Sequence, residues 1–490
     1  MLQILILFVF SFLTLTVPVY GTVPSFQELV DQTPAGATLK PPKGTYAGPV
    51  VINKTITVDG SNGVIINGQG KGSILKIEAH GTVIKNLTLT NSGDSHDRLD
   101  AGILVRSSRN KIINNIISDS LFGIDLQEAH ENLIMGNDVS SKDVPLGLRG
   151  DGIRIWASHK NVFRRNKIHD SRDMVIWYSN DNLIEDNEGW NNRYSLHFMF
   201  AGGNLVQRNK YHHNTVGIFL MYSRDAIVQH NQVKYSLGGT GIGIGLKEVD
   251  NMTIQYNEVV YCTAGFYFDL SPFQPDTYNF IKANKIAFNV AGATFNSTLP
   301  RNILKGNAFI GNLETVKVHG NGVATESLWE GNYYSDFEGF DRDADGYGDS
   351  YYHYDVYFET LWMDDEWMRF FYGTPVISMV NFLAKLAPIS QPRRLMSDTK
   401  PVFMKDYDLL FSEKNLFYNA PKINIEDDEG DDEEAPARFS GGDEEDEDEE
   451  MPARFAESDE EDDDEKAESD DDNLQKQKKS ANYNRYFLKQ

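Results

Sequence analysis

A six-residue motif with asparagine at both ends recurs through the middle of the chain and constrains the fold more than any other feature. Apart from the longer step from Asn204 to Asn279, successive copies are 21 to 29 residues apart, most often about 22. Self-similarity at such a period is the signature of a solenoid, in which each repeat stacks on the previous one. The copies are Asn132-Leu-Ile-Met-Gly-Asn137, Asn161-Val-Phe-Arg-Arg-Asn166, Asn182-Leu-Ile-Glu-Asp-Asn187, Asn204-Leu-Val-Gln-Arg-Asn209, Asn279-Phe-Ile-Lys-Ala-Asn284 and Asn302-Ile-Leu-Lys-Gly-Asn307.

Short glycine-led runs lie between the motifs and distinguish two kinds of solenoid. Gly152-Ile-Arg-Ile and Gly217-Ile-Phe-Leu are examples. A leucine-rich repeat requires its own leucine frame and a helical stretch, whereas here each repeat has several short β-branched runs that alternate. We therefore expect a parallel β-helix with aliphatic rows inside and asparagine ladders at the corners.

The two ends of the chain read differently from the repeats. Residues 1–21 hold no charged side chain and an apolar run, Leu2 to Val17, before small residues, which indicates a secretory signal; a single anchor helix is the alternative. We predict the β-helix over 22–337, a C-terminal cap and partner-contact segment over 338–405, and a tail over 406–490.

The net charge of -26 is concentrated in that tail. The run Glu426 to Asp472 contains 28 acidic and three basic residues, so the other 44 acids nearly balance 43 Lys and Arg. Such a run cannot bury enough apolar surface to fold, and we predict disorder. The body has no basic excess to hold a phosphate backbone, which excludes nucleic acid as a partner.

The segment after the repeats is rich in aromatic residues. Leu361 to Arg369 and Val376 to Leu386 are expected to be short amphipathic helices, and an extended segment begins at Gln391. We predict that their exposed aromatic residues either contact a partner or cover the last coil. The candidates for contact are Trp362, Trp367 and Phe371.

Several runs resemble the NosD family: Asp173-Met-Val-Ile-Trp-Tyr-Ser179, Ser195-Leu-His-Phe-Met-Phe200, Val216-Gly-Ile-Phe-Leu-Met-Tyr-Ser-Arg224 and Gly241-Ile-Gly-Ile-Gly-Leu-Lys247. The resemblance extends over roughly Thr22 to Met404 and does not cover the acidic tail. It implies a right-handed β-helix in the periplasm, docked on the permease and ATPase of an ABC transporter. It further implies copper handling, with a copper chaperone as donor, during assembly of the copper centres of nitrous oxide reductase. The membrane is reached only through the permease.

Strand alternation in the glycine-led runs places two rows of side chains on the outside. Arg154, Val175, His197 and Phe219 form one row, and Trp156, Trp177, Met199 and Met221 form the next. Imidazole and thioether donors suit Cu(I), so we predict a transient copper site at His197, Met199 and Met221. The aromatic residues Trp156, Trp177 and Phe219 would contact a partner.

The same outer rows are open to a simpler interpretation, a hydrophobic contact surface without metal. A second set consists of His169, Trp190, His212 and the neighbouring His213. It follows the corner asparagines of successive coils, where a solvated turn is the more common arrangement. Cys262 is expected to be a small core or turn residue.

An acidic loop after the repeats carries oxygen ligands at regular spacing. Asp341, Asp343, Asp345 and Asp349 occupy positions 1, 3, 5 and 9 with Gly346 at position 6, which is the pattern of a calcium loop. Tyr352 stands where an EF-hand has its bidentate glutamate. We predict a structural calcium site, with an acidic solvated turn as the alternative.

The other function class is sugar chemistry, because β-helices often carry lyases, epimerases and hydrolases or bind carbohydrate. Hydrolysis needs two carboxylates across a groove. Asp94, Asp97, Asp100, Asp125 and Asp151 are the candidates, but no recurring Lys, Arg and His set accompanies them. We therefore predict a protein without catalytic residues.

Overall fold

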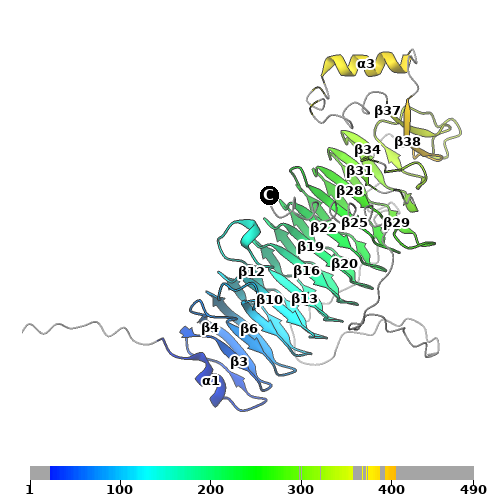
Figure 1. The fold of residues 1–490 in the computed structure, drawn as a ribbon. Helices are drawn as coiled ribbons and strands as arrows, with labels where there is room; N and C mark the ends of the chain where they lie inside the picture. The colour runs from blue at the N-terminus through cyan, green and yellow to red at the C-terminus, as the bar shows by residue number, and fades with distance from the viewer. Residues whose placement is uncertain are drawn as a thin grey trace, which may run out of the picture. The chain divides into compact units, whose positions relative to one another are not determined.

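The computed structural model describes residues 23–296, 298, 301–320, 322–356, 367, 371, 374–386 and 392–403 (Figure 1). The predicted signal, the helix expected at 361–369 and the acidic tail lie outside these residues, apart from Trp367. Where the chain is described, no helix has the length and apolarity needed to cross a membrane.

The repeats form stacked coils, with strands that follow one another in chain order from α1 toward β34 (Figure 1). The first sheet has 12 strands, all parallel. They are β3 (Val50–Ile52), β5 (Leu75–Ile77), β7 (Ala101–Val105), β10 (Phe122–Gln127), β13 (Ile153–Trp156), β16 (Asp173–Trp177), β19 (Tyr194–Met199), β22 (Val216–Met221), β25 (Ile242–Lys247), β28 (Ala264–Asp269), β31 (Ala291–Asn296) and β34 (Glu314–Val318).

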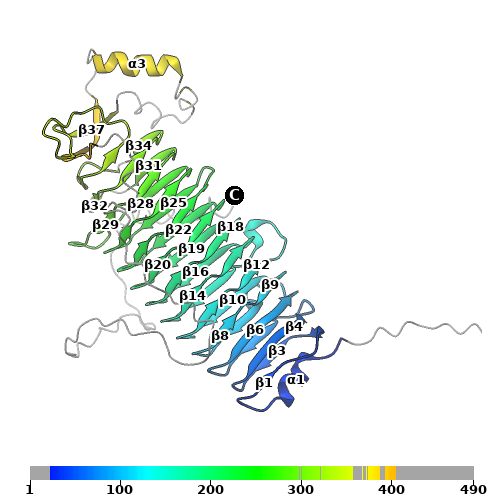
Figure 2. The same cartoon turned by 180° about the vertical axis from the view of Figure 1, so that it is seen from behind.

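The second sheet has 24 strands in two parallel ladders that share β4 (Thr57–Asn67) and β6 (Val83–Thr90). One ladder adds β1 (Thr38–Leu39), β8 (Lys111–Ile113), β11 (Leu133–Met135), β14 (Val162–Arg164), β17 (Leu183–Glu185), β20 (Leu205–Gln207), β23 (Ile227–Gln229), β26 (Thr253–Gln255), β29 (Asn279–Lys282), β32 (Asn302–Lys305) and β35 (Leu328–Glu330). The other, whose β9, β12 and β18 are labelled in Figure 2, adds β2 (Gly44–Ala47), β9 (Ile116–Ser118), β12 (Asp138–Ser140), β15 (Lys167–His169), β18 (Glu188–Trp190), β21 (Lys210–His212), β24 (Gln232–Lys234), β27 (Glu258–Val260), β30 (Lys285–Ala287), β33 (Ala308–Ile310) and β36 (Tyr333–Tyr334). The predicted parallel β-helix is confirmed.

Aliphatic side chains fill the interior in columns. Ile153 pairs with Met174, Ile155 with Ile176, and all four are fully buried. The inward phase expected from strand alternation is therefore correct. Each buried methylene contributes about 0.8 kcal/mol by removal from water, so continuous columns of this kind stabilise the whole solenoid.

The corner asparagines form hydrogen-bonded ladders inside the coil corners. In the longest ladder, the Nδ2 of Asn187 donates to the Oδ1 of Asn209 (3.0 Å). The Nδ2 of Asn209 donates in turn to the Oδ1 of Asn231 (2.9 Å). Backbone N–H groups donate to the same oxygens, so each buried amide is satisfied. The members of this ladder are Asn115, Asn137, Asn166, Asn187, Asn209, Asn231, Asn257, Asn284, Asn307 and Asn332.

Both ends of the solenoid are closed. At the start, α1 (Phe26–Gln32) buries Phe26 and Val30 against the first coils. At the far end, β37 (Tyr352–Val356) pairs antiparallel with β38 (Arg393–Asp398), and the Asp398 carboxylate accepts the last amide of the ladder from Asn332 (2.8 Å). The C-terminal segment thus has strands besides helix α3 (Pro375–Leu386), which matches the helix expected at Val376 to Leu386. One short helix, η1 (Leu146–Leu148), lies in a loop.

Candidate functional site

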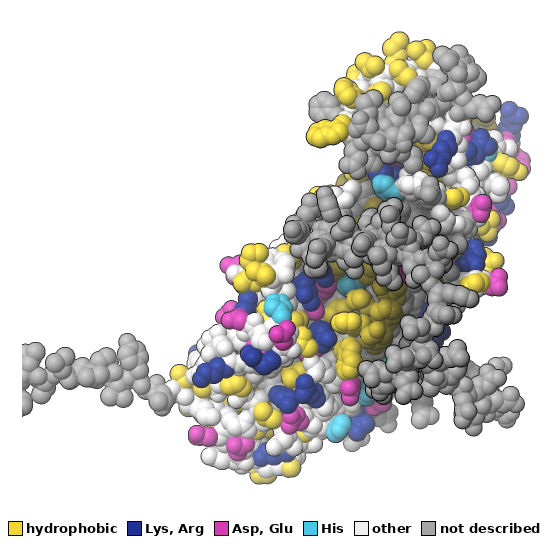
Figure 3. Space-filling view, in the orientation of Figure 1, with side chains coloured by type: hydrophobic (Ala, Val, Ile, Leu, Met, Phe, Trp, Pro, Cys, Tyr) yellow, Lys and Arg dark blue, Asp and Glu magenta, His cyan; other side chains and the backbone are white. Residues whose placement is uncertain are grey.

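The two outer rows lie in register on β13, β16, β19 and β22. Arg154 pairs with Val175, Val175 with His197 and His197 with Phe219. In the second row Trp156, Trp177, Met199 and Met221 are successive partners. Hydrophobic side chains gather on the face shown in Figure 3, over the middle of the solenoid.

The first outer row is more buried than its outward direction suggests. Val175, His197 and Phe219 are only 6 to 7% exposed. The ring of Tyr194 lies against two of them, with its centroid 4.7 Å from His197 and 5.8 Å from Phe219. Phe219 lies over Gly245, where a Cβ would approach its ring to 2.2 Å. This row is therefore a second packed layer, and Phe219 is less accessible to a partner than the more exposed Trp156 and Trp177.

His197 lies between a carboxylate and a thioether. Its Nδ1 is 3.3 Å from the Oδ2 of Asp173, and its Nε2 is 3.0 Å from the Sδ of Met221. Asp173 also accepts from Nε (2.9 Å) and Nη2 (2.5 Å) of Arg193. Burial favours the neutral acid, but the hydrogen bonds from His197 and Arg193 prevail and hold the pKa of Asp173 below its usual value.

The ionised Asp173 fixes the tautomer of His197. A carboxylate can only accept, so Nδ1 donates to Asp173. The thioether of Met221 also only accepts, so the 3.0 Å contact is a hydrogen bond when Nε2 carries a proton, and Nε2 becomes available as a metal ligand once that proton has left. Imidazole nitrogen and thioether sulfur are ligands for Cu(I). They are closer here than two ligands of one ion would be, but the flexible methionine can withdraw its sulfur. Of the predicted ligands, the structure brings His197 and Met221 into contact, with Met199 beside Met221 in register.

Asp125 and Asp151, two of the carboxylates considered for sugar chemistry, are buried and form salt bridges. Asp125 pairs with Arg154 (3.0 Å) and Asp151 with Arg172 (2.9 Å). Burial raises the pKa of both acids against the pull of these arginines, and the charge of Asp173 raises that of Asp151 further. Since both carboxylates are almost fully buried, they support the sheet from within it and do not line a groove.

Two of the remaining sugar candidates, Asp94 and Asp100, also have local partners. Asp94 lies 2.8 Å from the ammonium of Lys142, and the buried Asp100 accepts from the backbone of Ser95 (3.0 Å). Cys262 is buried too, and burial raises the pKa of its thiol to about 11. It is a core thiol at neutral pH, as expected from the sequence.

The acidic loop brings three of its four predicted ligands together. One oxygen each from Asp341, Asp343 and Asp345 lies within 4.8 Å of the others. Asp349 instead accepts from the backbone of Arg342 (3.0 Å). Gly346 has φ +87, which a tight turn at the sixth position requires.

The predicted contact residues of the C-terminal segment are only partly described. Trp367 is 86% and Phe371 49% exposed, while Trp362 lies outside the described residues. Among the side chains of helix α3 that the structure describes, four large apolar ones are exposed, namely Val376, Met379, Phe382 and Leu383.

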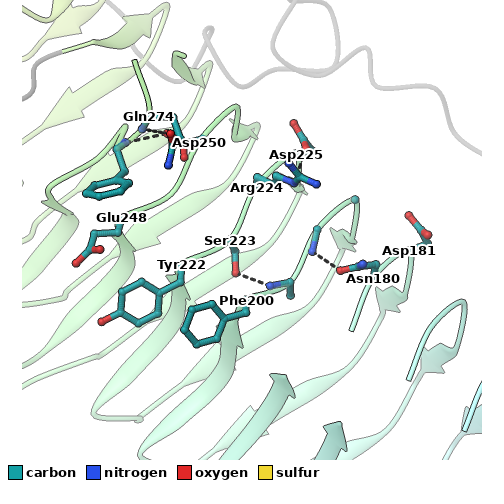
Figure 4. Close-up of a pocket in the computed structure, with 14 residues that line it drawn as sticks. Asn180, Asp181, Phe200, Tyr222, Ser223, Arg224, Asp225, Glu248, Asp250 and Gln274 are labelled. Atoms are coloured by element: carbon teal, nitrogen blue, oxygen red, sulfur yellow. Dashed lines mark hydrogen bonds and ion pairs between the residues drawn. The ribbon is translucent and has the colours of Figure 1, made fainter. Parts of the chain in front are cut away.

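Sequence reasoning missed an open groove of about 890 Å³ at the turns that follow β16, β19, β22 and β25 (Figure 4). Gly202 leaves a gap in its floor between Asn180 and Arg224, whereas a Cβ at Gly203 would meet the Asp181 carboxylate at 2.6 Å. Beside it the rings of Tyr178, Phe200 and Tyr222 stack 4.9 Å apart. Two sequence features could have indicated this groove. One is the Gly202-Gly203 pair, and the other is the aromatic residue that directly follows Trp177, Met199 and Met221 in three successive coils. Its lining residues are Asn180, Asp181, Phe200, Ala201, Gly202, Gly203, Tyr222, Ser223, Arg224, Asp225, Glu248, Asp250, Phe273 and Gln274.

Comparisons with known proteins agree with this architecture. Residues 43–170 match the family described as right handed beta helix region, and residues 140–339 match that described as periplasmic copper-binding protein (NosD). The chain is 29% identical to a probable ABC transporter binding protein NosD of Pseudomonas aeruginosa, over 71% of this chain and 83% of the relative. It is 28% identical to a protein of the same description from Stutzerimonas stutzeri, over 76% and 88%.

Two solved structures have a weak likeness to this chain. An epimerase module from Azotobacter vinelandii, mannuronan C-5 epimerase, covers 62% of this chain and 96% of its own, with 13% identity and a TM-score of 0.42. An alginate lyase covers 64% and 84%, with 12% identity and a TM-score of 0.45. Neither likeness bears on what this chain does.

Proposed function

We propose that this chain is a NosD-type protein, that it docks on the permease of a periplasm-facing ABC transporter, and that it assists copper delivery during assembly of the copper centres of nitrous oxide reductase. The matching family is described as copper-binding and the two relatives as probable ABC transporter binding proteins, and both descriptions support this assignment. The observation that carries it is the contact between His197 and Met221, with Asp173 behind the imidazole.

The arrangement suits transient binding of Cu(I). Asp173 and Arg193 cancel each other's charge, so the site is close to neutral and relies on soft donors. Two or three such donors bind less firmly than a complete ligand set, which permits release to an acceptor. Tyr194 and Phe219 limit water around the imidazole. No catalytic step is needed for this role; a copper chaperone would load the site.

Cu(I) competition measurements on the full chain test the site. Met199→Leu combined with Met221→Leu keeps apolar volume and removes both sulfurs, so we expect folding to persist and Cu(I) affinity to fall at least about tenfold. Met135→Leu, a half-buried methionine on β11, is the matched control. Equal affinity in the double variant and the control would refute the assignment.

We propose that the exposed aromatic residues around α3 contact the permease. Truncation is a poor test, because β38 supplies the buried Leu395 and Met396 and the terminal Asp398. Trp367→Ala with Phe371→Ala should instead reduce co-purification with the permease about tenfold, as loss of an aromatic anchor does. Phe340→Ala, 67% exposed in the acidic loop, is the control. Undiminished co-purification of the double variant would contradict the contact.

We also propose that the acidic loop holds structural calcium. Millimolar Ca²⁺ should raise the Tm of the full chain relative to excess chelator, because a ligand that binds only the folded state stabilises it. Asp343→Asn should abolish the increase and Asp276→Asn, an exposed aspartate elsewhere, should not. A calcium response that survives Asp343→Asn would locate the ion elsewhere.

The groove in Figure 4 favours carbohydrate binding as a second candidate. Exposed rings at Tyr178 and Phe200 lie beside planar polar groups such as Asp181 and Arg224, a combination that can pack against and hydrogen-bond a sugar. A Cβ at Gly202 would meet nothing closer than 3.6 Å, so Gly202→Gln fills the gap without strain. Binding of maltohexaose that Gly202→Gln removes would support this candidate, and no binding to the unaltered chain would dismiss it.

A further inference from the structure

Two consecutive imidazoles meet at the end of β21, in the second sheet. His212 is the last residue of the strand and His213 follows it. Their Nδ1 atoms are 3.0 Å apart. The copper site proposed above lies on the first sheet and uses neither residue.

Backbone conformation brings the pair together. Consecutive side chains of a strand point to opposite faces, which would separate neighbouring histidines. His213 has φ +55, in the left-handed region, and this ends the alternation so that both rings face the same side. Neighbouring coils adopt the same conformation at Asn191 and Tyr235.

Adjacent coils hold both rings in place. The ring of Trp190 stacks on His212 with centroids 5.9 Å apart, and that of Tyr235 stacks on His213 at 4.9 Å. The Nε2 of His212 lies 3.4 Å from the Oε1 of Glu188. A carboxylate behind the distal nitrogen favours the tautomer whose Nδ1 carries the lone pair, as in histidines that bind metals.

The separation of the two nitrogens selects a coordination geometry. With metal–nitrogen bonds of about 2.0 to 2.1 Å, ligands at right angles lie about 2.8 to 3.0 Å apart, and tetrahedral ligands about 3.3 to 3.4 Å apart. Square-planar or tetragonal sites with nitrogen and oxygen ligands are typical of Cu(II) and Ni(II). We propose that His212 and His213 chelate a tetragonal divalent ion, Cu(II) in the first place, with water at the remaining positions.

Three other histidines of the described segments are committed to hydrogen bonds. Both ring nitrogens of His169 face carboxylates, Asp170 (2.7 Å) and Asp138 (2.9 Å). The Nδ1 atoms of His130 and His159 accept backbone N–H groups (3.1 and 3.0 Å). His212 and His213 differ because each directs a nitrogen at the other. The same distance also suits a simple N–H···N hydrogen bond, so the experiment must separate the two.

Electron paramagnetic resonance of the full chain with one equivalent of Cu(II) tests the chelate. We expect hyperfine structure from two imidazole nitrogens, and its loss with at least about tenfold weaker binding in His212→Gln and in His213→Gln. His230→Gln, a lone imidazole stacked on Tyr256, is the matched control and should leave the spectrum unchanged. Carboxylates of the acidic run can bind Cu(II) only through oxygen, and that signal should persist in every variant.

Two results would overturn the proposal. One is a spectrum of the unaltered chain with oxygen ligands only, which would leave the pair as a hydrogen bond. The other is nitrogen hyperfine structure that survives both substitutions. Each is independent of Cu(I) binding by His197 and Met221, because the spectroscopy detects Cu(II) and the substituted residues lie in the other sheet. Thermal unfolding of the variants should match the unaltered chain, since both rings are at the surface.

Discussion

The asparagine ladder and the cluster around His197 are both polar networks that span several coils, yet they differ in kind. The ladder is neutral, lies inside the corners and has the same contacts at every step. The cluster is charged, lies outside the sheet and is confined to three coils. A uniform neutral network stabilises every coil alike, whereas a local charged one positions particular atoms and responds to protons and metals.

The largest effect should come from interrupting the ladder. Asn209→Ala removes the acceptor for two groups of Asn187 and the donor to the backbone of Ile184. Buried groups without partners cost about 1 to 3 kcal/mol each, so we expect about 3 kcal/mol lower stability by denaturant unfolding. Asn53→Ala, an exposed asparagine outside the ladder and without a positive φ, should cost little. Equal losses would show that the ladder does not carry this stability.

An intermediate effect is expected from Asp173→Asn. The substitution removes the charge that pairs with Arg193, which keeps about two-fifths of its side chain in solvent. Screening by that solvent limits the loss to about 1 to 2 kcal/mol. Cu(I) affinity should fall about tenfold, because the tautomer of His197 is no longer fixed. A variant with normal stability and normal Cu(I) affinity would remove the distinction between the two networks.

The smallest effect concerns pH. His159 accepts a backbone N–H through Nδ1 and stacks on His130 at 5.2 Å; burial, and then the charge of His130, lower its pKa below 6.5. Protonation abolishes that acceptor, so this contribution to stability is present above pH 6.5 and lost as pH falls through the lowered pKa.

A conservative variant isolates this titration. In the next coil Asn180 performs the same task by accepting the N–H of Gly202 (2.8 Å). His159→Asn should therefore keep the bond and show a smaller loss of Tm between pH 7 and pH 5 than the unaltered chain. An equal loss in both would place the acid sensitivity elsewhere.

The sequence predicted what repeats and missed what occurs once. Period and alternation were sufficient for the parallel β-helix and for the register that aligns His197 with Phe219 and Met199 with Met221. They could not reveal that the ring of Tyr194 lies against His197 and Phe219, since that depends on a ring crossing between coils. Nor could they show that Asp173 bonds to His197, because the two are 24 residues apart and belong to different coils.

Residues with left-handed backbone conformation account for two further features that the sequence did not predict, the histidine pair and the aromatic edge of the groove. His213 and Phe200 both have positive φ, which strand alternation does not anticipate. The first conformation joins two imidazoles, and the second places an aromatic ring at the edge of the groove. In both cases the sequence displayed the residues but not the direction of their side chains.

The carboxylate at the end of the ladder has a consequence for assembly. Every asparagine in the ladder passes a hydrogen bond onward, because an amide both accepts and donates. Asp398 only accepts, and it is held by Asn332, Gly331 and Tyr334 in a fully buried position. An uncapped last coil would present open strand edges to the first coil of another molecule. The single change from amide to acid ends the polar chain inside the protein, and so opposes polymerisation of solenoids end to end.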